Sequence, residues 1–334
     1  MIEIKVCPST LADGFSSYSQ VAINNLFDGK DVSHIIDFSF NSSHISENLS
    51  NAIQRISVSG VQEKFPALID NGYIRFSEKK ERSTHILKPA PWNNILSDRK
   101  YIPANEHLTM QIASQVYRIQ TAANGLCFTK KGELVYITKR FDILPDDSKV
   151  SLEDFASLIG RNEATNGTRF KYDSSYEDIA ICIHQYIPAW QINMERFFML
   201  VIFNYIYANG DAHLKNFSVM NYNGKYQLAP AYDLLNTSLH ISDSDFALEN
   251  GLSIHLKKTD TYQHTNHPCR EDFFRFGILI GLSDKCTNKI LDKFMQMPEL
   301  THKLIANSFL PNKLKRKYLK IVQERISRFI RKAE

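Results

Sequence analysis

The 334-residue sequence has few cysteines, little glycine and no long apolar run. Its five cysteines are scattered and include no Cys-x-x-Cys pair, which excludes a disulfide framework and a zinc finger and indicates a reducing cytoplasm. The most apolar segment, residues 197–208, is too short to span a bilayer and contains Asn204, so it predicts a buried helix and no membrane association. The N-terminus lacks a basic stretch followed by an apolar run, so we expect no signal peptide.

A strong charge of one sign is also missing. The net charge of +4 is too small to indicate nucleic-acid binding by itself. Hydrophobic residues make up 43% and charged residues 23%, which is ordinary for a globular protein. At roughly 150 residues per domain, the length predicts about two domains or lobes.

The residue pattern changes along the chain. Residues 1–50 are polar and predict short irregular elements, whereas residues 50–143 predict a sheet with one helix. The elements expected there are a hairpin at 65–76 around Asn71–Gly72, a strand at 84–90, a helix at 105–119 with Asn105 as its N-cap, and a strand at 132–143.

Helices dominate after Asp142. They are expected at 151–160, 176–187, 193–208, 270–281, 285–296, 300–308 and 311–331. The sequence therefore predicts an α+β fold with a sheet-rich N-lobe, residues 1–145, and a mostly helical C-lobe, residues 146–334. The boundary is expected near Asp142–Ser151.

One stretch in the second half carries chemistry. Residues 208–236 read ANGDAHLKNFSVMNYNGKYQLAPAYDLLN, which predicts a hairpin around Asn223–Gly224. Asp211 and Asn216 precede this hairpin and Asp233 follows it. Each alone is typical of a turn or a helix cap, but their ordered spacing is what phosphoryl transfer on a kinase scaffold requires.

In that chemistry each residue has a role. Asp211 accepts the proton of the substrate hydroxyl, while Asn216 and Asp233 supply the oxygen ligands that Mg²⁺ needs. Lys215 lies between Asp211 and Asn216 in the sequence, where its ammonium could neutralise a transferring phosphoryl group.

The first half offers possible nucleotide contacts. Lys88, on the strand at 84–90, and Glu106, on the following helix, match the pair in which a strand lysine contacts the α- and β-phosphates and a helix glutamate orients it. The alternative for Glu106 is an acid that stabilises the first turn of a helix. Backbone groups of Lys139, Arg140 and Phe141 could meet the adenine.

Residues 55–64, RISVSGVQEK, stand where a kinase carries its phosphate-covering loop. Gly60 permits one close approach of the backbone to phosphate, and the residues Gln62 to Lys64 would complete the cradle. The alternative is a surface turn. His255, His264, His267 and Cys269 have loose metal-ligand spacing, for which a polar surface loop is the favoured interpretation.

Taken together, these motifs resemble one family. The segments SVSGVQEK, THILKPA, NEHLTMQIA, ITKRFD, NGDAHLKNFSV and LAPAYDLL occur in the same order in the HipA-like serine/threonine kinases of bacterial toxin–antitoxin systems. The sequence departs from ordinary protein kinases because it has no GxGxxG, HRD or DFG motif.

The resemblance implies a bilobal kinase fold that uses ATP and Mg²⁺. It implies that Asp211 is the catalytic aspartate and that Asn216 and Asp233 are the metal ligands. The ATP-binding residues that it implies are Ser59, Gly60, Val61, Gln62, Glu63, Lys64, Lys88, Lys139, Arg140, Phe141, His213, Lys215 and Tyr232.

The length resembles the short form, HipT, of three-gene systems, since the extra N-terminal subdomain of HipA is not expected here. The resemblance implies an aminoacyl-tRNA synthetase as substrate, with tryptophanyl favoured over glutamyl-tRNA synthetase, and inhibition of translation and growth. It implies two antitoxin partners, a small HipS-like protein and a DNA-binding HipB-like protein. The chain would then contact DNA only indirectly, through the antitoxin. The resemblance also implies autophosphorylation on Ser57 and Ser59, where added negative charge would regulate activity.

Two alternatives remain open: a small-molecule kinase, and a non-catalytic corepressor that binds the antitoxin. The basic C-terminal helix also has two interpretations. Either its apolar stripe packs on the C-lobe, or its basic face docks tRNA-bound substrate or antitoxin-held DNA. The stripe consists of Leu314, Tyr318, Val322, Ile326 and Phe329.

Overall fold

The computed structural model describes residues 3–38, 40, 63–91, 96–144, 146 and 148–331. The chain divides into two compact units, each with its own sheet. Unit 1 comprises Met1–Ile112, Ala122–Ser148 and Lys303–Lys315, and unit 2 comprises Ala113–Thr121, Lys149–His302 and Arg316–Glu334. Within the described ranges, no helix combines the length and apolarity that crossing a bilayer requires.

The described strands of unit 1 form one sheet in the order β1-β5-β6-β4-β2-β3. Its strands are β1 (Ile35–Ile36), β2 (Phe65–Asp70), β3 (Tyr73–Phe76), β4 (His85–Pro89), β5 (Asn124–Thr129) and β6 (Leu134–Lys139). Neighbours run antiparallel except β1 and β5. The predicted hairpin is confirmed: Asn71 and Gly72 have φ of 48° and 78°, as a tight two-residue turn requires.

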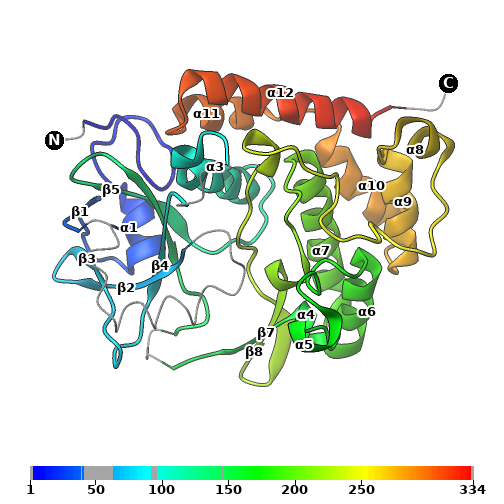
Figure 1. The fold of residues 1–334 in the computed structure, drawn as a ribbon, viewed down its shortest axis with the longest axis horizontal. Helices are drawn as coiled ribbons and strands as arrows, with labels where there is room; N and C mark the ends of the chain where they lie inside the picture. The colour runs from blue at the N-terminus through cyan, green and yellow to red at the C-terminus, as the bar shows by residue number, and fades with distance from the viewer. Residues whose placement is uncertain are drawn as a thin grey trace. The chain divides into compact units, whose positions relative to one another are not determined.

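Two elements of unit 1 differ from the prediction. Helix α1 (Gln20–Phe27) lies against β5 and β6 (Figure 1), where only irregular structure was expected, and the fully buried strand β5 was not predicted. Helix α3 (Ile102–Gln115) begins three residues before Asn105, so the prediction that Asn105 is an N-cap is wrong. Asn105 is instead completely buried, and its backbone carbonyl accepts a 2.9 Å hydrogen bond from the Thr109 hydroxyl.

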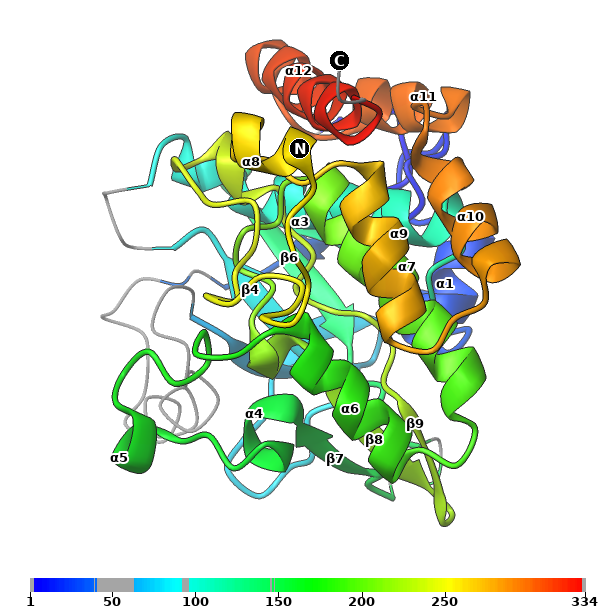
Figure 2. The same cartoon turned by 90° about the vertical axis from the view of Figure 1, so that its right-hand side faces the viewer.

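Unit 2 is mostly helical. Its helices are α4 (Phe155–Leu158), α5 (Glu163–Asn166), α6 (Tyr176–Tyr186), α7 (Trp190–Ile206), α8 (Asp260–Thr265), α9 (Arg270–Leu279) and α10 (Asp284–Leu291). The 3₁₀ turns of unit 2 are η3 (Leu214–Asn216), η4 (Thr237–Leu239) and η5 (Asp292–Phe294), whereas η2 (Arg99–Tyr101) belongs to unit 1. Helices α11 (Glu299–Asn307) and α12 (Asn312–Phe329) each have residues in both units. Figure 2 shows α7 beside α6 and α9, and α7 buries most of its apolar side chains.

A three-stranded antiparallel sheet of unit 2 consists of β7 (Ser151–Asp154), β8 (Ser218–Tyr222) and β9 (Lys225–Leu228). The β8–β9 hairpin is confirmed, with φ of 51° and 79° at Asn223 and Gly224. The helix predicted at 151–160 is wrong in its first half, because residues 151–154 pair with β8 as a strand. The helix starts only at Phe155, where the Asp154 carboxylate accepts from the Ser157 N–H.

The C-terminal helix confirms the packing interpretation. All five residues of the predicted apolar stripe of α12 are buried. In unit 2, the Tyr318 ring lies 6.5 Å from that of Tyr207, and the Phe329 ring lies 5.5 Å from that of Phe273.

Candidate functional site

The loop that carries Asp211 begins where α7 ends. Ala208 adopts a left-handed φ of 54°, which stops the helix and turns the chain. The Asn209 amide then donates to Asn204 Oδ1 at 2.9 Å, and the Gly210 N–H donates to the Thr237 hydroxyl at 3.0 Å. These contacts fix the backbone that leads into Asp211.

The Asp211 carboxylate accepts a 2.7 Å hydrogen bond from the Tyr172 hydroxyl. Burial raises the pKa of Asp211, while the Tyr172 hydrogen bond and the nearby Lys171 charge lower it. The charges of Asp243 and Asp233 raise it further. A carboxylate with a raised pKa is a better proton acceptor, which suits a general base.

Asn216 and Asp233 lie side by side in unit 2. The Asn216 side-chain amide donates to the Asp233 carboxylate at 3.3 Å, although 17 residues separate them in sequence. Asp233 has a left-handed φ of 56°, a conformation that Asp and Asn tolerate better than most residues. This pair of oxygen-bearing side chains fits Mg²⁺, which takes one or two protein ligands together with water and phosphate oxygens.

Tyr232 and Lys215, which directly precede Asp233 and Asn216 in the sequence, make further hydrogen bonds next to this pair. The Tyr232 hydroxyl lies 2.5 Å from the Ser218 hydroxyl and donates to the Lys215 carbonyl at 2.9 Å. The Lys215 ammonium donates to the Asp154 carboxylate at 3.0 Å. The His213 N–H donates to Asn216 Oδ1 at 3.2 Å, so His213 orients that amide.

In unit 1, Lys88 and Glu106 form a buried ion pair. The Lys88 ammonium lies 2.6 Å from Glu106 Oε1, and the two side chains are 4% and 3% exposed. The ammonium also lies 5.3 Å from the centre of the Tyr136 ring. The strand lysine and helix glutamate that the sequence pairs are therefore in contact.

The segment Lys139–Phe141 lies at the end of β6, and the backbone N–H groups of its first two residues already donate hydrogen bonds. The Lys139 N–H donates to the Ala123 carbonyl at 2.8 Å, and the Arg140 N–H donates to the Thr84 carbonyl at 2.9 Å. Adenine contacts here would therefore have to use carbonyl groups or Phe141. The Lys139 side chain pairs with Asp28, and that of Arg140 with Asp142.

Part of the predicted phosphate loop lies outside the described residues, namely Ser57, Ser59, Gly60, Val61 and Gln62. Glu63 and Lys64 are described, are half-buried and directly precede β2.

Three residues near the site were missed by the sequence analysis: Tyr172, Asp154 and Asp243. Tyr172 and Asp154 contact Asp211 and Lys215 from distant parts of the chain, so no local motif reports them. Asp243 packs so closely against Gly210 that a Cβ at position 210 would overlap its carboxylate. The glycine directly before the predicted catalytic aspartate was the one available signal.

The interpretation of the histidine cluster as a polar surface loop is wrong in part, because His264 lies in α8 and Cys269 is 3% exposed at the N-cap of α9. His267 Nδ1 lies 2.7 Å from the Asp245 carboxylate, and His255 Nδ1 lies 2.8 Å from that of Glu177. Among the described residues, no group of three or more His, Cys, Asp or Glu side chains could hold a metal ion.

Comparison with known proteins places these motifs in a family. A family model described as the HipA-like C-terminal domain matches residues 56–300, well over half of the chain. A Haemophilus influenzae protein named "Putative kinase" is 28% identical over 274 residues, which are 77% of each chain. A Sinorhizobium fredii protein named "Putative kinase Y4dM" is 31% identical over 224 residues, which cover 62% of this chain and 51% of that protein.

Two solved structures share the fold. HipA of Shewanella oneidensis, solved with HipB and operator DNA, has a TM-score of 0.63 at 18% identity over 84% of this chain and 70% of that one. The Helicobacter pylori proinflammatory kinase CtkA has a TM-score of 0.51 at 16% identity over 80% of this chain and 90% of that one. The predicted α+β kinase-like fold is confirmed. The chain therefore belongs to the HipA-like kinase family.

Proposed function

We propose that this protein is a toxin serine/threonine kinase that transfers the γ-phosphoryl group of ATP to an aminoacyl-tRNA synthetase and thereby inhibits translation. The observation that carries the proposal is the arrangement around the 209–216 loop. It holds a half-buried carboxylate of raised pKa, Asp211, together with an oxygen-bearing pair, Asn216 and Asp233. Family membership makes protein phosphorylation the expected use of this arrangement.

In the proposed reaction, the hydroxyl oxygen of a substrate serine or threonine forms a bond to the γ-phosphorus of ATP. The bond from that phosphorus to the β–γ bridging oxygen breaks, and ADP leaves. Asp211 accepts the hydroxyl proton, and Tyr172 fixes the orientation of the accepting carboxylate.

Asn216 and Asp233 would hold Mg²⁺, which neutralises phosphate charge when it is bound. Lys88, oriented by Glu106, would contact the α- and β-phosphates. Residues 59–64 would cover them. The Lys215 ammonium, on the same loop, is paired with Asp154 and would have to leave that partner to neutralise the transferring phosphoryl group.

The proposal extends to partners. The Shewanella HipA structure contains HipB and operator DNA. By analogy, we propose that a HipB-like antitoxin and a small HipS-like antitoxin bind this chain in the cytoplasm. The chain would contact DNA only through the antitoxin. Tryptophanyl-tRNA synthetase is the favoured substrate, ahead of glutamyl-tRNA synthetase.

Self-modification of Ser57 and Ser59 is a further part of the proposal. A phosphate on either serine adds roughly −1.5 to −2 charge at neutral pH, which would repel the phosphates of ATP. Intact mass of the active protein and of Asp233→Asn tests this. The active form should carry the mass of one or two phosphate groups that the variant lacks, and equal masses would contradict it.

The main test is transfer of label from radioactive ATP in a bacterial lysate, with the wild type, Asp211→Ala and the matched surface variant Asp284→Asn. Asp284 is exposed in the first turn of α10. The wild type and Asp284→Asn should label one protein besides the kinase, identified by mass spectrometry as a synthetase, and Asp211→Ala should label none.

Two results would reject the proposal. Label found only in small molecules would identify a small-molecule kinase. Growth inhibition that persists in both Asp211→Ala and Asp233→Asn would identify a non-catalytic corepressor.

A further inference from the structure

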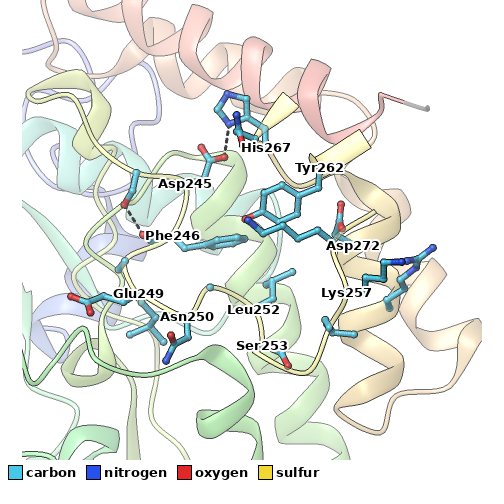
Figure 3. A pocket seen from close by; sticks show the side chains of 18 of the residues that line it. Asp245, Phe246, Glu249, Asn250, Leu252, Ser253, Lys257, Tyr262, His267 and Asp272 are labelled. Carbon is cyan, nitrogen blue, oxygen red and sulfur yellow. Dashed lines mark hydrogen bonds and ion pairs between the residues drawn. The ribbon is translucent and has the colours of Figure 1, made fainter. Parts of the chain in front are cut away.

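A cavity of about 730 Å³ in unit 2 contains none of the groups assigned above to catalysis or metal binding. Much of its wall comes from residues 243–258, which follow Asp233 in the chain. Figure 3 shows Phe246, Leu252 and Tyr262 among the side chains around it. A cavity of this size takes several side chains of a ligand rather than a single ion.

The cavity begins beside the proposed catalytic base. Arg169 in its wall lies 5.4 Å from the centre of the Tyr172 ring, and the Tyr172 hydroxyl donates to Asp211. Asp243, also in its wall, packs its carboxylate against Gly210, the residue before Asp211. A polypeptide whose hydroxyl reaches Asp211 would therefore have neighbouring residues at this cavity.

Two acids of the wall are fixed by contacts within unit 2. The Asp245 carboxylate pairs with Arg325 of α12, which is 6% exposed, and lies 2.7 Å from His267 Nδ1. The Asp272 carboxylate accepts hydrogen bonds from both the N–H and the hydroxyl of Thr259. These contacts form the wall before any ligand binds, which lowers the entropic cost of binding.

Two lysines of the wall, unlike these acids, are exposed to solvent. Lys257 and Lys258 are exposed at the cavity, and within the part of the chain that the structure describes neither ammonium is paired with a carboxylate. The Lys258 ammonium lies 4.4 Å from the centre of the Tyr262 ring. Two unneutralised cations beside apolar side chains complement a ligand that has an acidic side chain near apolar ones.

We propose that this cavity docks the polypeptide segment of the protein substrate that flanks the phosphoacceptor, with an acidic side chain of that segment at Lys257 and Lys258. The proposal rests on the kinase function above and adds to it where the substrate is recognised.

The test is the steady-state kinetics of the double variant Lys257→Glu, Lys258→Glu with ATP and purified bacterial tryptophanyl-tRNA synthetase. The matched control is Lys285→Glu, Lys289→Glu, which changes the charge equally at exposed positions of α10. We expect the KM for the synthetase to rise about tenfold or more in the first variant, with kcat and the KM for ATP unchanged. The control should match the wild type in all three constants.

The outcomes separate the two proposals. If the wild type phosphorylates the synthetase and the Lys257, Lys258 variant keeps the wild-type KM for it, the docking site is wrong and the kinase function stands. If the KM for ATP rises instead, the cavity serves the nucleotide and the docking site is again wrong. If the wild type transfers phosphate to neither this synthetase nor any protein of a lysate, both proposals fail.

Discussion

The Tyr172 hydroxyl donates a 2.7 Å hydrogen bond to the Asp211 carboxylate, across 39 positions of sequence. A hydrogen bond donated to the charged form of a carboxylate stabilises that form. The contact therefore holds the pKa of Asp211 down against the burial that raises it. This balance sets the pH above which the carboxylate can accept a proton.

Replacing Tyr172 with Phe should move the acidic limb of the pH–rate profile to higher pH. The hydrogen bond lowers the pKa of Asp211, so its removal raises that pKa, and more alkaline solution is then needed to deprotonate the base. Initial rates between pH 5.5 and 9 measure this. Tyr186→Phe, at an exposed position of α6, is the control. A loss of rate that is equal at every pH would show that Tyr172 acts only through packing.

Removing Lys88 should destabilise unit 1 more than removing Lys88 and Glu106 together. Lys88→Met takes the cation from beside a carboxylate that is 3% exposed, and breaking one side of a buried pair costs about 3–5 kcal/mol. The double variant Lys88→Met, Glu106→Gln leaves no such charge and should lose less. Urea unfolding measures both free energies. Equal or additive losses would contradict a direct coupling, whereas phosphoryl transfer should be abolished in both variants.

Asp233→Asn should keep the fold and lose the activity. Asn tolerates the left-handed backbone at this position, so the free energy of unfolding should change by less than about 0.5 kcal/mol. The lost charge weakens Mg²⁺ binding, and kcat should fall by about a hundredfold or more at a fixed Mg²⁺ concentration. Asp233→Ala should lose about 1 kcal/mol of stability in addition. Partial recovery of the Asn variant at high Mg²⁺ would support the metal role, and a normal rate at low Mg²⁺ would exclude it.

Acid should destabilise the protein through two buried histidines of unit 1. Burial lowers the pKa of His85 and of His107 to about 4, below the ordinary value of 6.5. The unfolded chain therefore binds these protons first. The stability contribution is complete above pH 6.5 and is lost as the pH falls towards 4, by roughly 3 kcal/mol for each histidine.

Urea unfolding at pH 7.5, 5.5 and 4.5 tests this dependence. His107→Gln removes one titrating group and should flatten the curve, while His264→Gln, at an exposed position of α8, should leave the slope unchanged. An identical slope in wild type and His107→Gln would rule out His107 as a source of the acid sensitivity.

Local chemistry accounts for what the sequence predicted correctly. The turns Asn71–Gly72 and Asn223–Gly224 were predictable because two adjacent positive φ angles need these residue types. The grouping of Asn216 with Asp233 was predictable because a two-residue turn brings the two ends of its hairpin together. Lys88 and Glu106 followed from the order of one strand and one helix.

Non-local pairing accounts for the errors. Residues 151–154 form a strand only because β8, more than 60 residues later, pairs with them. The N-terminus of α3 was misplaced because Asn105, a typical capping residue, lies within the first turns of the helix and is buried. The contact between Tyr172 and Asp211 depends on tertiary packing, which no spacing rule reports.

The missing side chain at Gly210 has a consequence for how related chains can vary. Because the Asp243 carboxylate occupies the space that a Cβ at position 210 would need, the two positions are sterically coupled. A relative with alanine at position 210 should carry a smaller residue at position 243 or turn the Asp243 side chain away from that position. Substitutions at positions 210 and 243 should therefore covary, so that a change in the wall of the proposed docking cavity would be linked to the residue that precedes the proposed base.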